Sequence, residues 1–303
     1  MPLRCAVRPG PVAPVVAAAI TGNGGELVDI EDADALVWTD PSDPVGLRAM
    51  LDEHPGVSWV QLPFAGVDRF IGLFDDGRTW TSTKGAYSEA VAEHALALGL
   101  AGLRQLPRRA RATSWGGQAG TRLAGSAVTV VGGGGITEAL LRLLVPFHVE
   151  ATVVRRHVAP VEGAAHVVGP DELHVALASA RLVVLALALT PETTGIIGAA
   201  ELSQMRQEAW LVNVARGAHV VTDDLVVALA EKAIGGAALD VTDPEPLPAG
   251  HALWALDNCL ITPHTANTWE MAEPMFAERA GANVGRMVRG EPLLGVVDPA
   301  LGY

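Results

Sequence analysis

Short apolar runs alternate with amphipathic or turn-rich stretches along the chain. In the first 91 residues, apolar runs at 5–7, 26–28, 35–38 and 58–61 are separated by stretches such as the helix-like segment 45–53. Alternation of short strands with helices is typical of βα units that build a parallel sheet. The opening part of the chain therefore predicts a small α/β unit in which the first strand, at 5–7, is followed by a helix.

A second series of the same kind begins after residue 125. Several of its apolar runs are continuous rather than alternating, as expected for parallel strands that are covered on both faces. The predicted strands are 128–131, 151–154, 182–187, 210–214, 237–241 and 259–262, and helices fit at 137–144, 173–179 and 223–231. This series predicts a second and larger parallel sheet.

A long amphipathic segment, 88–106, lies between the two series, and we expect it to be a helix that ends at Pro107 and bridges two domains. The next residues, 108–125, are rich in Arg, Gly, Thr and Ser around Trp115, a composition typical of an excursion from the core. A chain of 303 residues also exceeds the usual size of one hydrophobic core, which again predicts two domains.

Composition excludes several classes of function. The formal charge of −13 opposes binding to nucleic acid, whose phosphates need clustered Lys and Arg. The longest clean apolar run, 182–189, is far shorter than the roughly 20 residues that cross a bilayer. Cys5 and Cys259 are the only cysteines, too few for a disulfide framework or a structural zinc site. We therefore expect a soluble, cytoplasmic protein without a bound metal.

A cluster of glycines, 132–135, separates a predicted strand from a predicted helix. Gly132 can form the tight turn, Gly134 lets the backbone approach a pyrophosphate, and the amides at the helix start favour its negative charge. The third glycine of the G-x-G-x-x-G pattern is replaced by Thr137. A flexible turn explains an isolated glycine string equally well. Here the strand before, the helix after and a second strand form the βαβ unit that a dinucleotide site needs.

Arg155 and Arg156 follow the second strand of that unit, where an NAD-binding fold usually has an Asp or Glu for the ribose hydroxyls. Arginine cannot accept a hydrogen bond from ribose, but its guanidinium can donate two hydrogen bonds to a 2′-phosphate. The pair therefore predicts NADP(H) as the preferred cofactor, with NAD(H) as the other choice. Two solvated surface arginines are the alternative interpretation.

Polar segments follow three successive predicted strands, at 213–217, 240–246 and 262–266. In open α/β sheets, such strand ends line the ligand site. Together with Leu189-Thr190-Pro191-Glu192-Thr193, these segments resemble the D-isomer-specific 2-hydroxyacid dehydrogenases, and the glyoxylate/hydroxypyruvate reductases among them. Shorter matches in the same order are found at 59–60, 65–68, 91–93 and 123–125.

The resemblance places the catalytic Arg, Glu and His of the family on Arg216, Glu245 and His264. The chemistry suits a small 2-keto acid. The fork of Arg216 can hold the carboxylate and stabilise charge on the carbonyl oxygen, and His264, as an imidazolium, can donate the proton. Glu245 is then the carboxylate partner that keeps the imidazole charged. Taken singly, Arg216 also suits a helix cap, Glu245 a surface loop and His264 a buried, hydrogen-bonded histidine.

The same resemblance assigns residues to cofactor and substrate. Asp240 is expected to face the nicotinamide carboxamide, the alternative being an ordinary strand-end aspartate in a turn. The backbone amides of Ala65 and Gly66 are expected to hold the substrate carboxylate, the alternative being that residues 62–64 before them only pack in a core. The residues expected to contact the cofactor are Gly132, Gly134, Gly135, Ile136, Arg155, Arg156, Thr190, Ala215 and Asp240.

The resemblance also implies the architecture. A flavodoxin-like substrate (catalytic) domain combines 1–91 with 269–303, to which a helix at 269–289 returns, and a doubly wound Rossmann domain spans 92–268. A homodimer is implied as well, with Trp115 either in the interface or lying on its own subunit. The competing hypothesis is a nucleotide-sensing regulatory protein that keeps this fold without turnover.

Overall fold

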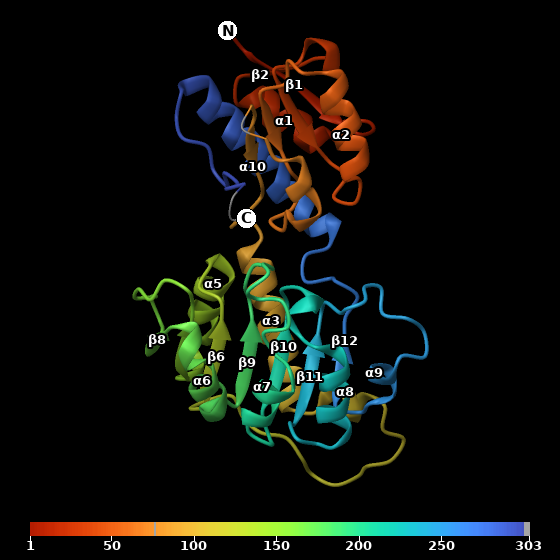
Figure 1. Cartoon of the computed structure of the whole chain (residues 1–303), viewed down its shortest axis with the longest axis vertical. Helices are drawn as coiled ribbons and strands as arrows, with labels where there is room; N and C mark the ends of the chain where they lie inside the picture. The colour runs from red at the N-terminus through yellow and green to blue at the C-terminus, as the bar shows by residue number, and fades with distance from the viewer. Residues whose placement is uncertain (76, 300–303) are drawn as a thin grey trace. The chain divides into compact units, whose positions relative to one another are not determined.

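The computed structural model describes residues 1–75 and 77–299, and these form two compact units (Figure 1). The first unit combines Met1–Tyr87 with the chain from Thr268 onward, and the second is Ser88–Asn267. Each unit has a parallel β-sheet between layers of helices, which confirms the predicted α/β class. The boundary predicted after residue 91 would divide a helix that begins at Ser88 and belongs to the second unit.

The sheet of the first unit has the strand order β2-β1-β3-β4-β5, which is the order of flavodoxin-like folds. Its strands are β1 (Leu3–Arg8), β2 (Gly25–Leu27), β3 (Ala35–Trp38), β4 (Trp59–Gln61) and β5 (Thr79–Thr81), and its helices are α1 (Pro14–Gly22), α2 (Pro44–Glu53) and α10 (Trp269–Arg289). The bounds of α10 agree with the helix predicted at 269–289.

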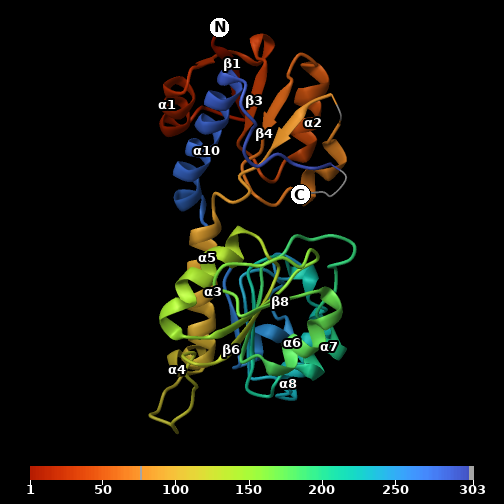
Figure 2. The same ribbon diagram turned by 90° about the vertical axis from the view of Figure 1, so that its left-hand side faces the viewer.

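Two apolar layers hold this sheet in place. On β3, Ala35 and Val37 face the layer that contains α1 and α10, whereas Leu36 and Trp38 face the layer of α2. Helices α1 and α10 pack side by side on one face of the sheet (Figure 2). The end of the chain therefore returns to complete the core of the first unit.

The sheet of the second unit has the order β12-β11-β10-β9-β6-β7-β8, the pattern of a doubly wound Rossmann sheet. Its strands are β6 (Ala127–Val131), β7 (Glu150–Val154), β8 (His166–Val168), β9 (Leu182–Leu185), β10 (Trp210–Asn213), β11 (Gly236–Leu239) and β12 (Cys259–Ile261). Its helices are α3 (Ser88–Leu103), α4 (Leu106–Ala110), α5 (Gly135–Leu144), α6 (Leu173–Ser179), α7 (Ala199–Gln204), α8 (Thr222–Ala230) and α9 (Ala252–Ala255). The chain order reverses between β6 and β9, and ligands bind at such a reversal, beyond the carboxyl ends of the strands.

Both faces of this sheet are buried, as the continuous apolar runs predicted. On β9, Leu182 and Val184 pack in the layer of α3 and α5, and Val183 and Leu185 pack in the layer of α6, α7 and α8. Within the part of the chain that the structure describes, no helix is both long and apolar enough to cross a bilayer.

The helix that opens the second unit is shorter than predicted. It ends at Leu103 rather than residue 106, because Gln105 has the left-handed φ of +53° and reverses the chain. Pro107 does not end this helix. It lies buried in the first turn of α4, where a missing N–H costs no helical hydrogen bond. After α4 the predicted excursion follows, and Trp115 on it is 97 % exposed.

Candidate active site

The glycine turn after β6 has the shape of a phosphate cradle. Gly132 has a φ of +114°, and a Cβ there would lie 2.1 Å from the carbonyl oxygen of Ala186, so only glycine fits. A Cβ on Gly134 would meet no atom within 4 Å. Gly135 and Ile136 begin α5, and its N-cap makes no side-chain capping bond. An anion can therefore approach the first amides of α5.

Thr137 takes the place of the third glycine without opening the turn. Its side chain is buried, and its Oγ1 donates a hydrogen bond of 2.9 Å to the carbonyl oxygen of Gly132. The hydroxyl thus ties the first turn of α5 to the glycine turn. The residues present fit a bound pyrophosphate despite this departure from the pattern.

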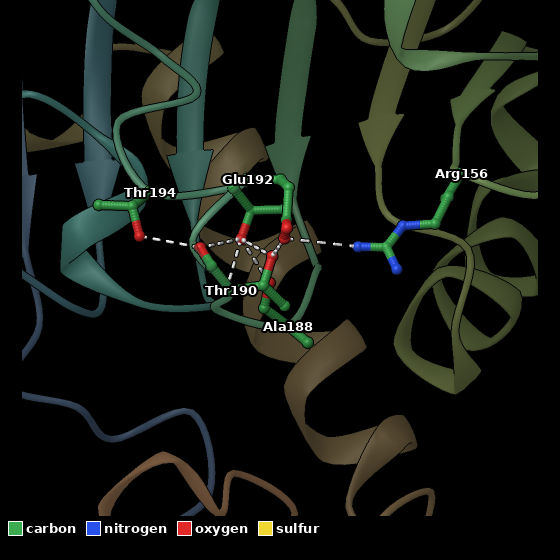
Figure 3. Close-up of polar contacts among 6 residues, drawn as sticks. Arg156, Ala188, Thr190, Glu192 and Thr194 are labelled. Atoms are coloured by element: carbon green, nitrogen blue, oxygen red, sulfur yellow. Dashed lines mark hydrogen bonds and ion pairs between the residues drawn. The ribbon is translucent and has the colours of Figure 1, made fainter. Parts of the chain in front are cut away.

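Both arginines that were predicted to bind a 2′-phosphate stand at the end of β7, which pairs with β6. The Cδ and Nε atoms of Arg155 would lie 2.8 Å from a Cβ on Gly133, so this side chain lies against the glycine turn. Arg156 extends toward the loop after β9, where its Nη2 is 3.7 Å from Oε2 of Glu192 (Figure 3). The fold therefore places Arg155 against the glycine turn and Arg156 beside the loop after β9.

Arg216 follows β10 in a turn that Asn213 fixes. The buried Asn213 side chain accepts a hydrogen bond of 3.0 Å from the amide of Ala215 and donates one of 2.8 Å to the carbonyl oxygen of Arg216. A Cβ on Gly217 would lie 2.0 Å from the carbonyl group of Thr242, so the chain after β10 runs directly against the chain after β11. Sequence reasoning assigned no role to Asn213, although an asparagine at a strand end can bond the backbone in this way.

Asp240 directly follows β11, and its side chain accepts several hydrogen bonds. Its carboxylate is almost fully buried and accepts hydrogen bonds from Thr262 Oγ1 at 2.6 Å and from the amides of Thr265 and Ala266 at 2.9 and 3.0 Å. His94 Nε2 lies 3.2 Å from the same carboxylate and 3.1 Å from Thr262 Oγ1. Asp240 thus fixes the turn after β12. Sequence reasoning offered a strand-end aspartate in a turn as the alternative for Asp240, but it missed His94.

These contacts determine the charge state of Asp240. Burial raises its pKa, but the hydrogen bonds from His94, Thr262 and the two amides outweigh burial and lower the pKa to about 2. A carboxylate whose pKa is lower in the folded than in the unfolded chain stabilises the fold above its unfolded pKa of about 3.9. That stabilisation is lost as the pH falls from about 4 through 2.

We expect this loss to be measurable by chemical unfolding. Between pH 5 and pH 2, the free energy of unfolding of the native chain should fall by about 2 kcal/mol more than that of Asp240→Asn, which has no carboxylate to titrate. Asp257→Asn, which alters a carboxylate that is 63 % exposed, serves as the matched control and should follow the native chain. Parallel pH curves for the native chain and Asp240→Asn would contradict this account of Asp240.

His264 and Glu245 form a direct pair, with 2.7 Å between Nδ1 and Oε1. The backbone of His264 has a φ of +53°, which is uncommon for a residue other than glycine. Its amide donates to the carbonyl oxygens of Asp240 at 2.8 Å and Thr262 at 3.0 Å, and these bonds hold it in that conformation. An ionised carboxylate can only accept a hydrogen bond, so a contact of this kind favours the imidazole form with a proton on Nδ1.

The remaining predicted residues are distributed between the two units. Because β10, β11 and β12 are adjacent and parallel, the segments that carry Arg216, Glu245 and His264 all leave the sheet at the carboxyl ends of its strands. Ala215 lies in the turn after β10, and Thr190 in the loop after β9. Ala65 and Gly66 are not among this group, because they follow β4 in the first unit.

The predicted alternative for residues 62–64 also has a structural basis. Leu62 is buried in the core of the first unit, and Phe64 packs edge-on against Tyr87 and Trp269. The carbonyl oxygen of Pro63 accepts hydrogen bonds from Thr83 and Tyr87. These residues therefore pack in a core, and they also fix the chain that leads into Ala65 and Gly66.

Comparison with known proteins identifies the family. The family model described as "D-isomer specific 2-hydroxyacid dehydrogenase, NAD binding domain" matches residues 94–266, more than half of the chain. The chain belongs to the D-isomer-specific 2-hydroxyacid dehydrogenases. The resemblance seen in the sequence is confirmed, and with it the prediction that this dehydrogenase uses a nicotinamide cofactor.

Relatives of this dehydrogenase include proteins of known structure or activity. The glyoxylate reductase/hydroxypyruvate reductase of Homo sapiens is 34 % identical over 223 residues, which cover 70 % of this chain and 67 % of the human protein. A D-isomer specific 2-hydroxyacid dehydrogenase from Xanthobacter autotrophicus Py2, solved with NADPH and MES, has a TM-score of 0.86 at 28 % identity and covers 100 % of this chain and 99 % of its own. The NADPH-dependent glyoxylate/hydroxypyruvate reductase of Sinorhizobium meliloti, solved with NADP and sulfate, has a TM-score of 0.81 at 25 % identity and covers 99 % and 100 %.

Proposed function

We propose that this dehydrogenase reduces a small 2-keto acid to a D-2-hydroxy acid, with NADP(H) as its preferred cofactor and NAD(H) as the other choice. The observation that carries the proposal is the 2.7 Å pair of His264 and Glu245, next to a strand end that carries Arg216. The human and Sinorhizobium relatives, which are named for glyoxylate and hydroxypyruvate, support this substrate class.

Each of the three catalytic side chains has a separate task. When bound, the nicotinamide supplies the hydride. Arg216 binds the substrate carboxylate and carbonyl oxygen through its fork of N–H donors, and it stabilises the negative charge that develops on that oxygen. His264 donates the proton from Nε2 to the same oxygen. Glu245 accepts from Nδ1, which orients the ring and stabilises the imidazolium.

The cofactor proposal is supported by the shape and charge of the turn after β6. Gly132, Gly134, Gly135 and Ile136 supply the open backbone for the pyrophosphate. Arg155 and Arg156 supply guanidinium groups for a 2′-phosphate, and the Xanthobacter and Sinorhizobium structures contain NADPH and NADP. Thr190, Ala215 and Asp240 would line the rest of the site.

The first unit is proposed as the substrate domain. The amides of Ala65 and Gly66 would hold the substrate carboxylate there, and the second unit would bind the dinucleotide. We further infer that the protein is cytoplasmic and forms a homodimer. The two buried free cysteines support a reducing setting, and the 97 % exposed Trp115 supports a partner surface on the excursion after α4.

A panel of 2-keto acids tests the proposed function. The purified chain is expected to oxidise NADPH with glyoxylate, hydroxypyruvate or a bulkier 2-keto acid, and its kcat/KM for NADPH should exceed that for NADH about tenfold. The absorbance of the reduced nicotinamide reports both values. Bound NADP⁺ without turnover on any member of the panel would instead favour the nucleotide-sensing protein, and a cofactor ratio near one would contradict the preference.

A further inference from the structure

A carboxylate stands beside the arginine to which the proposed function assigns the 2′-phosphate. Oε2 of Glu192 is 3.7 Å from Nη2 of Arg156, although the two residues come from different strand ends, β9 and β7 (Figure 3). The glycine turn follows β6, which lies between these two strands in the sheet. A phosphate bound to Arg156 would therefore meet a negative charge that is already paired with the same guanidinium.

The Glu192 carboxylate is fixed by its own turn as well as by Arg156. Thr190 Oγ1 donates a hydrogen bond of 2.8 Å to Oε2 of Glu192 (Figure 3). The turn is closed by hydrogen bonds from the Thr190 amide to Thr193 Oγ1 at 2.8 Å and from Thr194 Oγ1 to the Thr190 carbonyl oxygen at 2.9 Å. The hydrogen bond from Thr190, then a hydrogen bond from the backbone of Glu192 itself and, as the smallest contribution, the charge of Arg156 lower the pKa of Glu192, so the side chain is ionised at neutral pH.

We propose that Glu192 is a specificity-determining residue for the cofactor: its carboxylate competes with the 2′-phosphate for Arg156 and so limits the preference for NADP(H). This inference rests on the proposed function, in which Arg156 binds that phosphate. NAD(H) has no 2′-phosphate, so its binding leaves the pair of Glu192 and Arg156 in place. Cofactor specificity is the difference between the affinities for NADP(H) and NAD(H). The negative charge of Glu192 lowers only the affinity for NADP(H), because only that cofactor carries the 2′-phosphate.

Exposure limits the size of the effect. The Arg156 side chain is 48 % exposed and that of Glu192 is 71 % exposed, so water and salt screen their attraction. Exposed pairs of this kind change an equilibrium constant by about two- to fivefold. Direct repulsion between Glu192 and the phosphate adds to this, and we expect a total of about three- to tenfold.

Calorimetric binding of NADP⁺ and NAD⁺, without substrate, provides the test. Glu192→Gln keeps an acceptor for Thr190 but removes the charge, and it should tighten NADP⁺ binding about three- to tenfold while NAD⁺ changes less than about twofold. The increase in NADP⁺ affinity caused by Glu192→Gln should be smaller in 0.5 M salt, because salt screens the charge that the substitution removes. Glu208→Gln is the matched control, because Glu208 is a half-exposed carboxylate that pairs with Arg206 and Arg181 just before the amino end of β10. It should change neither affinity.

Variants of Arg156 separate this inference from the proposed function. In an Arg156→Ala background, most of the gain from Glu192→Gln should disappear, because the competition acts through the guanidinium. If Arg156→Ala weakens NADP⁺ but Glu192→Gln does not tighten it, or tightens both cofactors equally, the role of Glu192 is overturned while the cofactor site stands. A gain that persists undiminished in the Arg156→Ala background also overturns the competition. If Arg156→Ala leaves NADP⁺ binding unchanged, the proposed phosphate site is wrong and this inference falls with it.

Discussion

Replacing His264 by glutamine is expected to lower kcat about 10²- to 10⁴-fold, with a modest change in cofactor binding. Glutamine can still donate a hydrogen bond to the substrate oxygen, but it cannot transfer a proton. The 2.7 Å contact to Glu245 orients the ring through Nδ1, which leaves Nε2 as the nitrogen to which the proposed function assigns the proton transfer. Steady-state turnover and calorimetric NADP⁺ binding, measured on the same preparation, separate the two effects.

The chain offers a matched control for this substitution. His166 and Glu150 form a similar exposed pair, 3.1 Å apart, at the amino ends of β8 and β7. The proposed site lies beyond the carboxyl ends of the strands, so this pair is at the other end of the sheet. His166→Gln removes an imidazole from a His–Glu pair without reaching the proposed site, so kcat should stay near the native value. Near-native turnover in His264→Gln would show that another group supplies the proton.

Arg216→Ala is expected to damage substrate binding and turnover together. An arginine–carboxylate contact with two charge-assisted hydrogen bonds contributes about 1.5 to 3 kcal/mol per bond, so kcat/KM should fall about 10²- to 10⁴-fold. KM should rise because the carboxylate contact exists in the ground state, and kcat should fall because the growing charge on the carbonyl oxygen loses its partner. Arg216→Lys keeps the charge without the planar fork and should recover only a small part of the loss.

Arg206→Ala is the matched control for this prediction. Arg206 is a half-exposed arginine that pairs with Glu208 just before β10, whereas Arg216 follows the carboxyl end of the same strand. Its removal should leave kcat/KM unchanged. If Arg216→Ala altered only KM, the arginine would contribute to binding but would not stabilise the developing charge.

Much of the secondary structure followed from the spacing of apolar residues. The strands at 128–131 and 35–38 and the helix at 173–179 agree with β6, β3 and α6, and the helix at 269–289, which belongs to the architecture implied by the resemblance, agrees with α10. Continuous apolar runs indicated strands covered on both faces, and the two layers around β9 confirm this. The edge strands β5 and β8 were missed, because each is only three residues long and too short to show a periodic pattern.

Local sequence was misleading at the end of the long helix and did not reveal a long-range contact next to it. Proline was expected to end the helix at 88–106, but the chain turns earlier, at Gln105. Gly102, just before that turn, lies so close to Trp210 that a Cβ there would be 2.2 Å from its ring. Because Trp210 is over one hundred residues away in the sequence, no local pattern could reveal this contact.

The sequence by itself determined the α/β class, the succession of most strands along the chain and the residue types that follow them, because periodicity and short motifs are local properties. Only the tertiary structure decided which of those strand ends are neighbours. The sheet order brings Asp240 beside Thr262, the packing of α3 on the sheet adds His94, and the loops after β9 and β7 set Glu192 beside Arg156. Such pairs depend on distances between side chains that lie far apart along the chain, and those distances exist only once the strands are packed side by side.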